Sequence, residues 1–212
     1  MGIIKTIITS AVLYCGTAVD LLVILMHFFA KIRDKNGIKD LYIGQFIGSG
    51  LLILISLFFA YILHFIPEKH LLGLLGIIPI FLGLKVLIVG ESDGEELAHQ
   101  KLNKPQKLNL IKNIIFITIV SCGSDNIGLF VPYFISLSPI DLLITLIVFV
   151  VMIFLLVFTA HRLTDIPLIG SLLEKYSQWF IAIIYITLGI SILIENRSID
   201  FLIGLLSQTI SK

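Results

Sequence analysis

Long apolar runs are the feature of this sequence that most restricts its fold. The stretches 2–30, 41–65 and 110–137 are each longer than the roughly 20 residues that a helix needs to cross the hydrocarbon core of a bilayer. Only 14% of the 212 residues are charged, and the mean hydropathy is +1.07. An ordinary soluble domain carries about 25% charged residues. The chain is therefore predicted to be an integral membrane protein.

Three further apolar segments bring the expected number of spans to six. They cover residues 71–89, 142–160 and 179–194. Six spans use most of the chain and leave no room for a soluble catalytic domain, so any function must be built inside the helix bundle or on its short loops. The expected fold class is an all-α integral membrane protein with six transmembrane helices.

An internal repeat divides the chain into two halves. KTIITSAVLYCGT, which begins at Lys5, matches KNIIFITIVSCGS, which begins at Lys112, at an offset of 107. LGLKVLI from Leu82 matches LGISILI from Leu188 at an offset of 106. An odd number of spans per copy inverts the second copy, and inverted repeats place the substrate site near the membrane midplane. We expect two inverted three-helix repeats, with resemblance by apolar composition alone as the alternative.

The polar stretch between the two halves sets the domain boundaries. Residues 1–90 form the first expected repeat and 91–109 a cytoplasmic linker loop. Residues 110–212 form the second repeat, which ends in a short amphipathic tail over 198–211.

Lysine and arginine residues predict the orientation. Ten of them flank the loops after the first, third and fifth spans, and four lie on the opposite side. Because basic loops stay in the cytoplasm, both termini are expected to be extracytoplasmic in a multi-pass protein of the plasma membrane.

Acidic residues within predicted spans are the main candidates for a substrate site. Asp20 follows Cys-Gly-Thr in the first span, and Asp125 follows Cys-Gly-Ser in the fourth. A carboxylate in the hydrocarbon region is costly unless it is paired, hydrated or bound to a cation. The alternative is a structural aspartate or one nearer the membrane surface. The stretch SCGSDNIG predicts an interruption of the fourth helix. The oxygen atoms of Ser124 and Asn126 in this stretch, together with that of Thr17, are further candidate ligands for a cation.

The two cysteines are weaker candidates for metal ligands. Cys15 and Cys122 occupy equivalent positions in the two repeats, and thiolates select soft ions such as Zn(II), Cd(II) and Cu(I). A buried cysteine is also commonly a small hydrophobic residue, which is the reading we favour.

Small residues and prolines within the spans are assigned to helix packing or helix breaks. Gln45 lies between Gly44 and Gly48, a small-xxx-small pair, so it is expected to hydrogen-bond another helix or to touch substrate. Lys85 balances an aspartate or reaches towards the cytoplasmic edge. The remaining positions in this group are Gly16, Gly123, Gly128, Pro79 and Pro132.

Several function classes find no support in the sequence. A nucleophilic triad, a phosphate-binding loop and an HExxH motif are all missing from it. The net charge of +1 is not that of a nucleic-acid-binding surface. We therefore expect no enzyme, no permanently bound cofactor and no nucleic-acid partner; the small residues in the spans leave a homodimer open.

The sequence resembles a known transporter family. YIGQFIG, GLLGIIPIFLGL and SDNIGLFVPYF, in this order and at these spacings, resemble the CadD-type cadmium resistance transporters of bacteria, a branch of the LysE-like exporter superfamily. The resemblance implies a six-span exporter of Cd(II) and other divalent cations at the bacterial plasma membrane. Asp20, Asp125 and Asn126 carry over as implied site residues.

One departure from the family pattern concerns the first span. Family members usually read close to GTNIDDL, whereas this chain reads GTAVDLL, with Ala18 and Leu21 in place of an asparagine and an aspartate. Two oxygen ligands are therefore missing. This departure leaves the substrate open between cadmium, another metal with Cys15 and Cys122 compensating, and a solute that is not a metal.

The function expected from the sequence is proton-coupled export of Cd(II), or of Zn(II) or Mn(II), by alternating access. Export of a small organic solute such as an amino acid is the first alternative. A membrane protein that protects or scaffolds a partner without transporting anything is the second.

Overall fold

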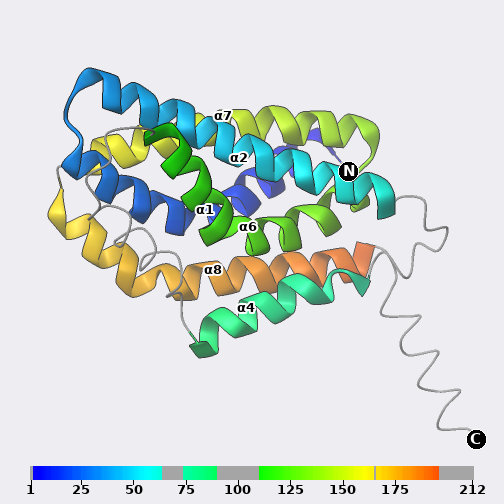
Figure 1. Cartoon of the computed structure of the whole chain (residues 1–212). Coiled ribbons are helices and arrows are strands. Elements are labelled where there is room, and N and C mark those ends of the chain that lie inside the picture. The colour runs from blue at the N-terminus through cyan, green and yellow to red at the C-terminus, as the bar shows by residue number, and fades with distance from the viewer. Residues whose placement is uncertain (1, 64–73, 90–109, 165, 196–212) are drawn as a thin grey trace, which may run out of the picture.

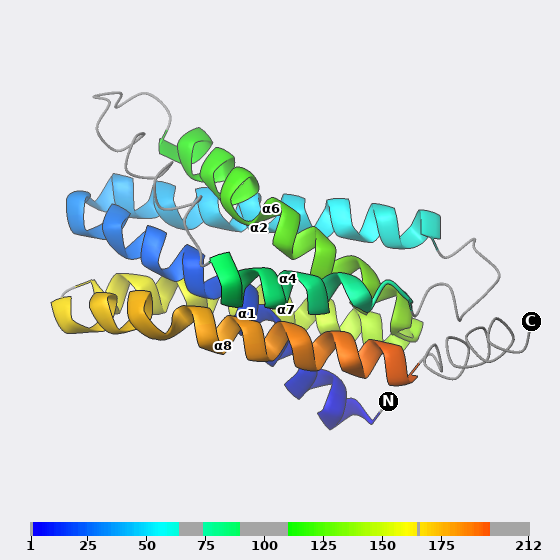
Figure 2. The same ribbon diagram turned by 90° about the horizontal axis from the view of Figure 1, so that it is seen from below.

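The computed structural model describes residues 2–63, 74–89, 110–164 and 166–195, and this part of the chain is entirely helical (Figure 1). Its helices are α1 (Ile3–Lys31), α2 (Lys35–Leu63), α4 (Ile77–Val89), α6 (Leu110–Ser136), α7 (Pro139–Leu163) and α8 (Pro167–Glu195). Helices α2, α4, α7 and α8 run roughly along one common direction, and α1 and α6 cross them obliquely (Figure 2).

Four of these helices, α1, α2, α6 and α7, are long and apolar enough to cross a membrane. Two shorter apolar helices accompany them over Ile77–Ile88 and Gln178–Ile194. Large apolar side chains such as Ile88, Ile140 and Phe81 are more than 60% exposed, which is the surface expected of a protein solvated by lipid. The all-helical prediction is confirmed.

Two helices begin six or more residues earlier than the sequence predicts. The second span was expected to start at Leu41, but α2 starts at Lys35, and the sixth was expected from Trp179, but α8 starts at Pro167. Hydropathy assigns polar residues to loops, whereas a helix continues through the headgroup region. The connection between α1 and α2 is consequently short, because only Ile32–Asp34 separates the two helices.

Local signals explain where these helices begin. The Asp34 carboxylate accepts a hydrogen bond from the Gly37 backbone N–H at 2.9 Å, in the first turn of α2. Ser138 precedes α7, accepts from the Asp141 N–H at 3.2 Å and is followed by Pro139. A hydroxyl cap followed by proline at the first helical position is a favourable helix start.

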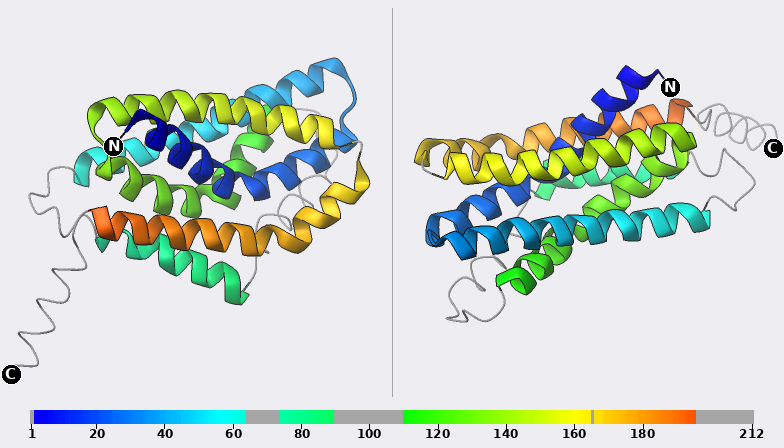
Figure 3. Two further views of the ribbon diagram at one scale, coloured as in Figure 1. Left: turned by 180° about the vertical axis from the view of Figure 1, so that it is seen from behind. Right: turned by 90° about the horizontal axis from the view of Figure 1, so that it is seen from above.

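The expected interruption of the fourth span is wrong. α6 continues without a break from Leu110 to Ser136 through the Gly123–Gly128 stretch, although its ribbon bends (Figures 1 and 3). In a low-dielectric environment a broken turn would leave backbone groups unsatisfied. Glycine and an internal Pro132 are therefore accommodated by bending and not by unwinding.

Two helix pairs pack in parallel. Along the α1–α7 contact, Thr6 bonds Asp141 and, one turn later, Ser10 bonds Thr145. Along the α2–α6 contact, Gly44 lies against Ile114 and Gly48 against Thr118. A Cβ atom added at Gly44 or Gly48 would lie 2.9 Å from the Cβ of its neighbour. The two glycines therefore permit close helix approach.

The third pair, α4 and α8, is antiparallel and crosses on two glycines. A Cβ atom at Gly83 would lie 2.8 Å from Ile186 and 3.0 Å from the Ala182 carbonyl oxygen. A Cβ atom at Gly189 would lie 2.6 Å from Ile80 and 2.5 Å from the Gly76 carbonyl oxygen. At one end of this pair, Gln178 Nε2 donates to the carbonyl oxygens of Val86 and Leu87, both at 2.9 Å.

Several predicted segments fall outside the described residues. These are the start of the third span at 71–73, the linker 91–109 and the amphipathic tail 198–211.

Substitution at the α4–α8 crossing tests this packing. Gly189→Ala is expected to lower the free energy of unfolding by about 1–3 kcal/mol, because the new methyl group meets backbone atoms that cannot move aside. Gly50→Ala is the control, because a Cβ atom there meets nothing within 4 Å. Thermal unfolding in detergent measures both. Equal melting temperatures would mean that the two backbones are farther apart than described.

Candidate functional site

The two predicted acids lie on different helices in the middle part of the chain's described bundle. Asp20 on α1 and Asp125 on α6 are both half-buried. The hydroxyl of Ser124, which is itself exposed, donates to the Asp125 carboxylate at 3.1 Å. Thr17 is buried and donates to the Tyr14 carbonyl oxygen of its own helix at 3.1 Å. Its hydroxyl is thus occupied by the backbone.

Asn126 is the predicted site residue whose side chain is buried with an unpaired atom. Its side chain is 4% exposed, and its Oδ1 atom has no hydrogen-bond partner. The Ser121 hydroxyl, on the same helix, and the Tyr14 hydroxyl on α1 are likewise buried without a partner. A buried polar atom left unpaired costs about 1–3 kcal/mol. All three atoms lie near the middle of α1 and α6.

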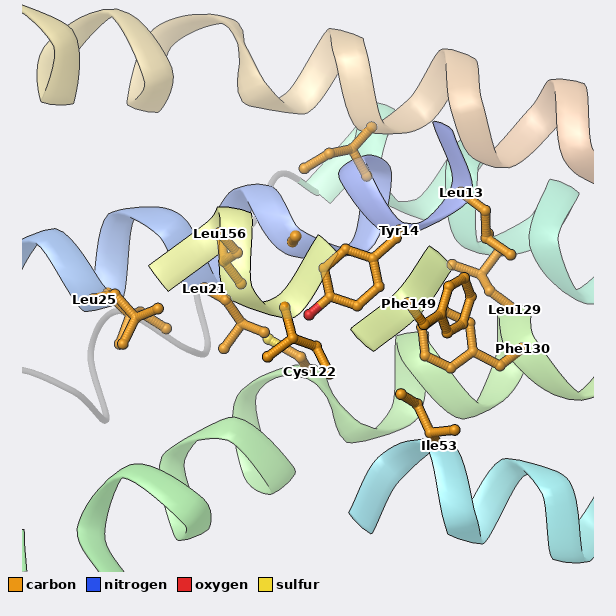
Figure 4. Close-up of a cluster of buried hydrophobic side chains, with 14 of the residues drawn as sticks. Leu13, Tyr14, Leu21, Leu25, Ile53, Cys122, Leu129, Phe130, Phe149 and Leu156 are labelled. Carbon is orange, nitrogen blue, oxygen red and sulfur yellow. The ribbon is translucent and has the colours of Figure 1, made fainter. Parts of the chain in front are cut away.

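The two cysteines differ although the sequence repeat equates them. Cys122 is 3% exposed and belongs to the buried core, whereas Cys15 is exposed. Neither is in a disulfide bond. Figure 4 shows Cys122 facing Tyr14, with Leu21 beside it. The structure therefore separates one interior thiol from one surface thiol.

A buried polar chain links α2 to α6 beside this position. Thr118 Oγ1 donates to Gln45 Oε1 at 3.0 Å, and Gln45 Nε2 donates to Ser49 Oγ at 2.8 Å. Gln45 is fully buried. Its amide is therefore engaged with another helix, which is one of the two roles that the sequence leaves open for it.

The remaining predicted positions lie in helix contacts or at the surface. A Cβ atom at Gly16 would lie 2.7 Å from Ile184 on α8, and one at Gly128 would lie 3.0 Å from Leu82 on α4. At Gly123 the nearest atom, in Leu52, is 3.6 Å away. Pro79 is buried in the first turn of α4, where its missing N–H leaves no bond unmade, and Lys85 is exposed.

Sequence reasoning missed a second polar group, which lies between α1, α6 and α7. Thr6 Oγ1 donates to the Asp141 carboxylate at 2.6 Å, and Ser138 donates to its other oxygen at 2.7 Å. Ser10 bonds both Tyr133, at 3.0 Å, and Thr145, at 2.9 Å. Thr6 and Ser10 are four residues apart, as are Asp141 and Thr145, so each pair lies on one helix face. This spacing is the sequence signal that could have matched the two polar faces.

Among the described residues, no three histidine, cysteine, aspartate or glutamate side chains lie close enough to hold one metal ion together. A closed four-residue cage of the structural zinc kind is thus not formed there. The interior offers hydroxyl and amide oxygens with one thiol.

A bundle of long apolar helices with polar side chains and half-buried acids among them is typical of a multi-pass membrane protein with a polar interior site. The family model of the cadmium resistance transporters matches residues 14–205. The chain therefore belongs to the cadmium resistance transporter family, which is a transporter family and not an enzyme family. No curated protein and no solved structure matches the chain.

The Ser10 hydroxyl offers a test of the missed polar group. Ser10→Ala is expected to lower the free energy of unfolding by about 1 kcal/mol, the usual size of a hydrogen bond between membrane helices. Thr9→Ala, at a half-buried position on the same helix, is the control. The double variant Ser10→Ala with Thr145→Val should lose less than the sum of the single losses. Strict additivity would show that the two hydroxyls do not interact.

Proposed function

We propose that this protein is a secondary transporter that exports a divalent heavy-metal cation, Cd(II) or an ion like it, across the bacterial plasma membrane. The observation that carries the proposal is the unpartnered Asn126 amide oxygen, buried on α6 beside the half-buried Asp125 of the same helix. Family membership over residues 14–205 supports the substrate class. Carboxylate and amide oxygens are ligands that a divalent cation accepts.

The helix pairing supports two inverted repeats. In the proposed repeat, α1 corresponds to α6, α2 to α7 and α4 to α8. A two-fold rotation that exchanges the two repeats then replaces the parallel α1–α7 pair by the parallel α6–α2 pair. The same rotation exchanges α4 with α8, so their antiparallel pair is unchanged. This is the pattern of a two-fold axis in the membrane plane.

The α4–α8 crossing supports the same proposal residue by residue. Gly83 and Gly189 are 106 positions apart, as are Ile80 and Ile186. Gly83 meets Ile186, and Gly189 meets Ile80, so the two contacts are equivalent under the repeat. Resemblance by apolar composition alone does not require reciprocal contacts of this kind.

The contacts that break the symmetry support alternating access. Gly16 on α1 is packed tightly against Ile184 on α8. The corresponding Gly123 on α6 lies nearest to Leu52 of α2 instead of a residue of α4. Rocking of one repeat against the other would interchange these two arrangements.

The acids are proposed to hold the ion and to carry protons in return. An ionised carboxylate inside the bilayer is stabilised by a cation, and it takes up a proton when the cation leaves. The carboxylates of Asp20 and Asp125 therefore hold the ion in one state and protons in the other. Oxygen atoms of Asn126, Ser124 and Thr17 complete the surroundings of the ion. The absence of a phosphate-binding loop from the sequence favours a proton gradient over ATP as the energy source.

Substitution of the acids tests metal export. Asp125→Asn and Asp20→Asn should each abolish the resistance of cells to Cd(II) and remove the rise in melting temperature that Cd(II) gives the purified protein, because a native-state ligand stabilises by mass action. Asp40→Asn, at the polar start of α2, is the control and should retain both. If no metal changed the melting temperature and the protein transported an amino acid, the proposal of metal export would be wrong. Unaltered resistance in both variants would favour a scaffold.

We also propose that both termini lie outside the cytoplasm, and the positions of the described basic residues support this orientation. Lys31, Arg33, Lys35, Lys112 and Arg162 all lie where α1 and α7 end or α2 and α6 begin, which is one end of the bundle (Figure 1). Basic residues stay on the cytoplasmic side.

Thiol labelling tests this orientation. In a variant without Cys15 and Cys122, a cysteine placed at Ile140 should react with a membrane-impermeant maleimide on intact cells, because Ile140 is 71% exposed at the opposite end. A cysteine placed at the exposed Asn36 should react only after the cells are opened. The reverse pattern would invert the topology.

A further inference from the structure

The hydroxyl of Tyr14 is a buried polar group on α1 with Ser49 of α2 as a polar neighbour. The side chain is 3% exposed, and no partner lies within hydrogen-bond distance of the hydroxyl. Its ring packs against Phe149 of α7, with centroids 5.4 Å apart, and a phenylalanine could make that contact without the cost of a buried hydroxyl. The hydroxyl is therefore not needed for the ring packing.

A directed chain of polar groups reaches the neighbourhood of this hydroxyl. Thr118 donates to Gln45, and Gln45 donates to Ser49. Because the Ser49 oxygen accepts from the Gln45 amide, its own hydrogen is available to another acceptor. Ser49 is a close polar neighbour of the Tyr14 hydroxyl. A hydrogen donated from Ser49 would leave the Tyr14 hydrogen to be donated elsewhere.

The acceptor that we assign to that hydrogen is the Cys122 sulfur, with which the Tyr14 hydroxyl forms no hydrogen bond in this structure. Cys122 is an electrostatic neighbour of Tyr14, and Figure 4 shows the Tyr14 hydroxyl directed towards it. A donor directed at sulfur stabilises the thiolate, which is the form that binds metals.

Asn126 supplies the second ligand position on the same helix. It follows Cys122 by four residues, so the two Cβ atoms lie about 5–6 Å apart on one helix face. One ion bridges such a span with metal–ligand bonds of about 2.0–2.6 Å. The Asn126 Oδ1 atom is buried and has no partner. It is a second, independent sign of a ligand at this place.

We propose that Cys122 and Asn126 bind a thiophilic divalent cation inside the bundle, and that Tyr14 positions and stabilises the Cys122 thiolate that holds it. The inference rests on the proposed export of such a cation and names the source of its selectivity. Binding exchanges the thiol proton for the ion and leaves a sulfur–metal bond, and the proton goes to water. A soft sulfur ligand prefers Cd(II) and Zn(II) to Mn(II).

A single thiolate also suits transport. Permanent zinc sites use four protein ligands, whereas a transported ion must bind tightly enough to enter and weakly enough to leave. One sulfur with neutral oxygens meets the second condition while keeping a preference for soft ions.

The test is a Cd(II) titration of the purified protein, followed by the ultraviolet charge-transfer band of the Cd–thiolate bond and by melting temperature. Cys122→Ser and Cys122→Ala should abolish the band, and Cys15→Ser should keep it. Tyr14→Phe should keep the band but weaken Cd(II) binding about tenfold or more, the loss expected for a hydrogen bond to a charged group. Mn(II) binding should be unchanged in Tyr14→Phe.

Tyr133→Phe is the matched control, because it also removes a buried tyrosine hydroxyl, one that bonds Ser10. It should lower the melting temperature without changing Cd(II) affinity. A band that survives in both Cys122 variants, or an unchanged Cd(II) affinity in Tyr14→Phe, would overturn the inference.

Cellular resistance separates this inference from the proposed function. Resistance that is lost in Asp125→Asn but retained in Cys122→Ser would reject the thiolate site and leave metal export standing. No Cd(II) resistance from the unaltered protein would reject both.

Discussion

Every backbone polar group that crosses a hydrocarbon layer must find its partner within the protein, and the rest of this structure follows from that requirement. It keeps α6 helical through Gly123–Gly128 and bends it instead of breaking it. It also explains why the side-chain amide of Gln178 on α8 donates hydrogen bonds to carbonyl oxygens in the last turn of α4. With the backbone fully occupied, chemistry must come from side chains, and the few buried polar side chains become the places where function resides.

Those side chains fall into two groups with different character. Between α1, α6 and α7, the hydroxyls of Thr6 and Ser10 are saturated by Asp141, Thr145 and Tyr133. The polar atoms of that group are hydrogen-bonded to one another, and they stabilise the contact between the helices. Around Tyr14 and Asn126, polar atoms remain unmatched. A network whose polar atoms are all paired stabilises helix packing, whereas the buried unpaired atoms mark the place where we propose that an ion binds.

The sequence predicted what depends on composition and failed where a particular neighbour decides. Apolar run length located the described helices, because membrane solvation selects for it, but it placed the start of α8 at Trp179, since the polar turns after Pro167 look like a loop. Asp20 and Asp125 stood out as acids in apolar surroundings, whereas Asp141 lies at the edge of an apolar run and drew no notice. The unequal burial of Cys15 and Cys122 depends on which helices approach each one. No spacing rule supplies that.

The contact between Gln178 and the end of α4 has a mechanical consequence. Parting α4 from α8 at that end would strip two carbonyl oxygens of their donor, and the glycine crossing farther along leaves the two backbones no room to slide. The two helices therefore behave as one stiff strut. Because α4 and α8 belong to different proposed repeats, any rocking of one repeat against the other would have to turn about this fixed pair.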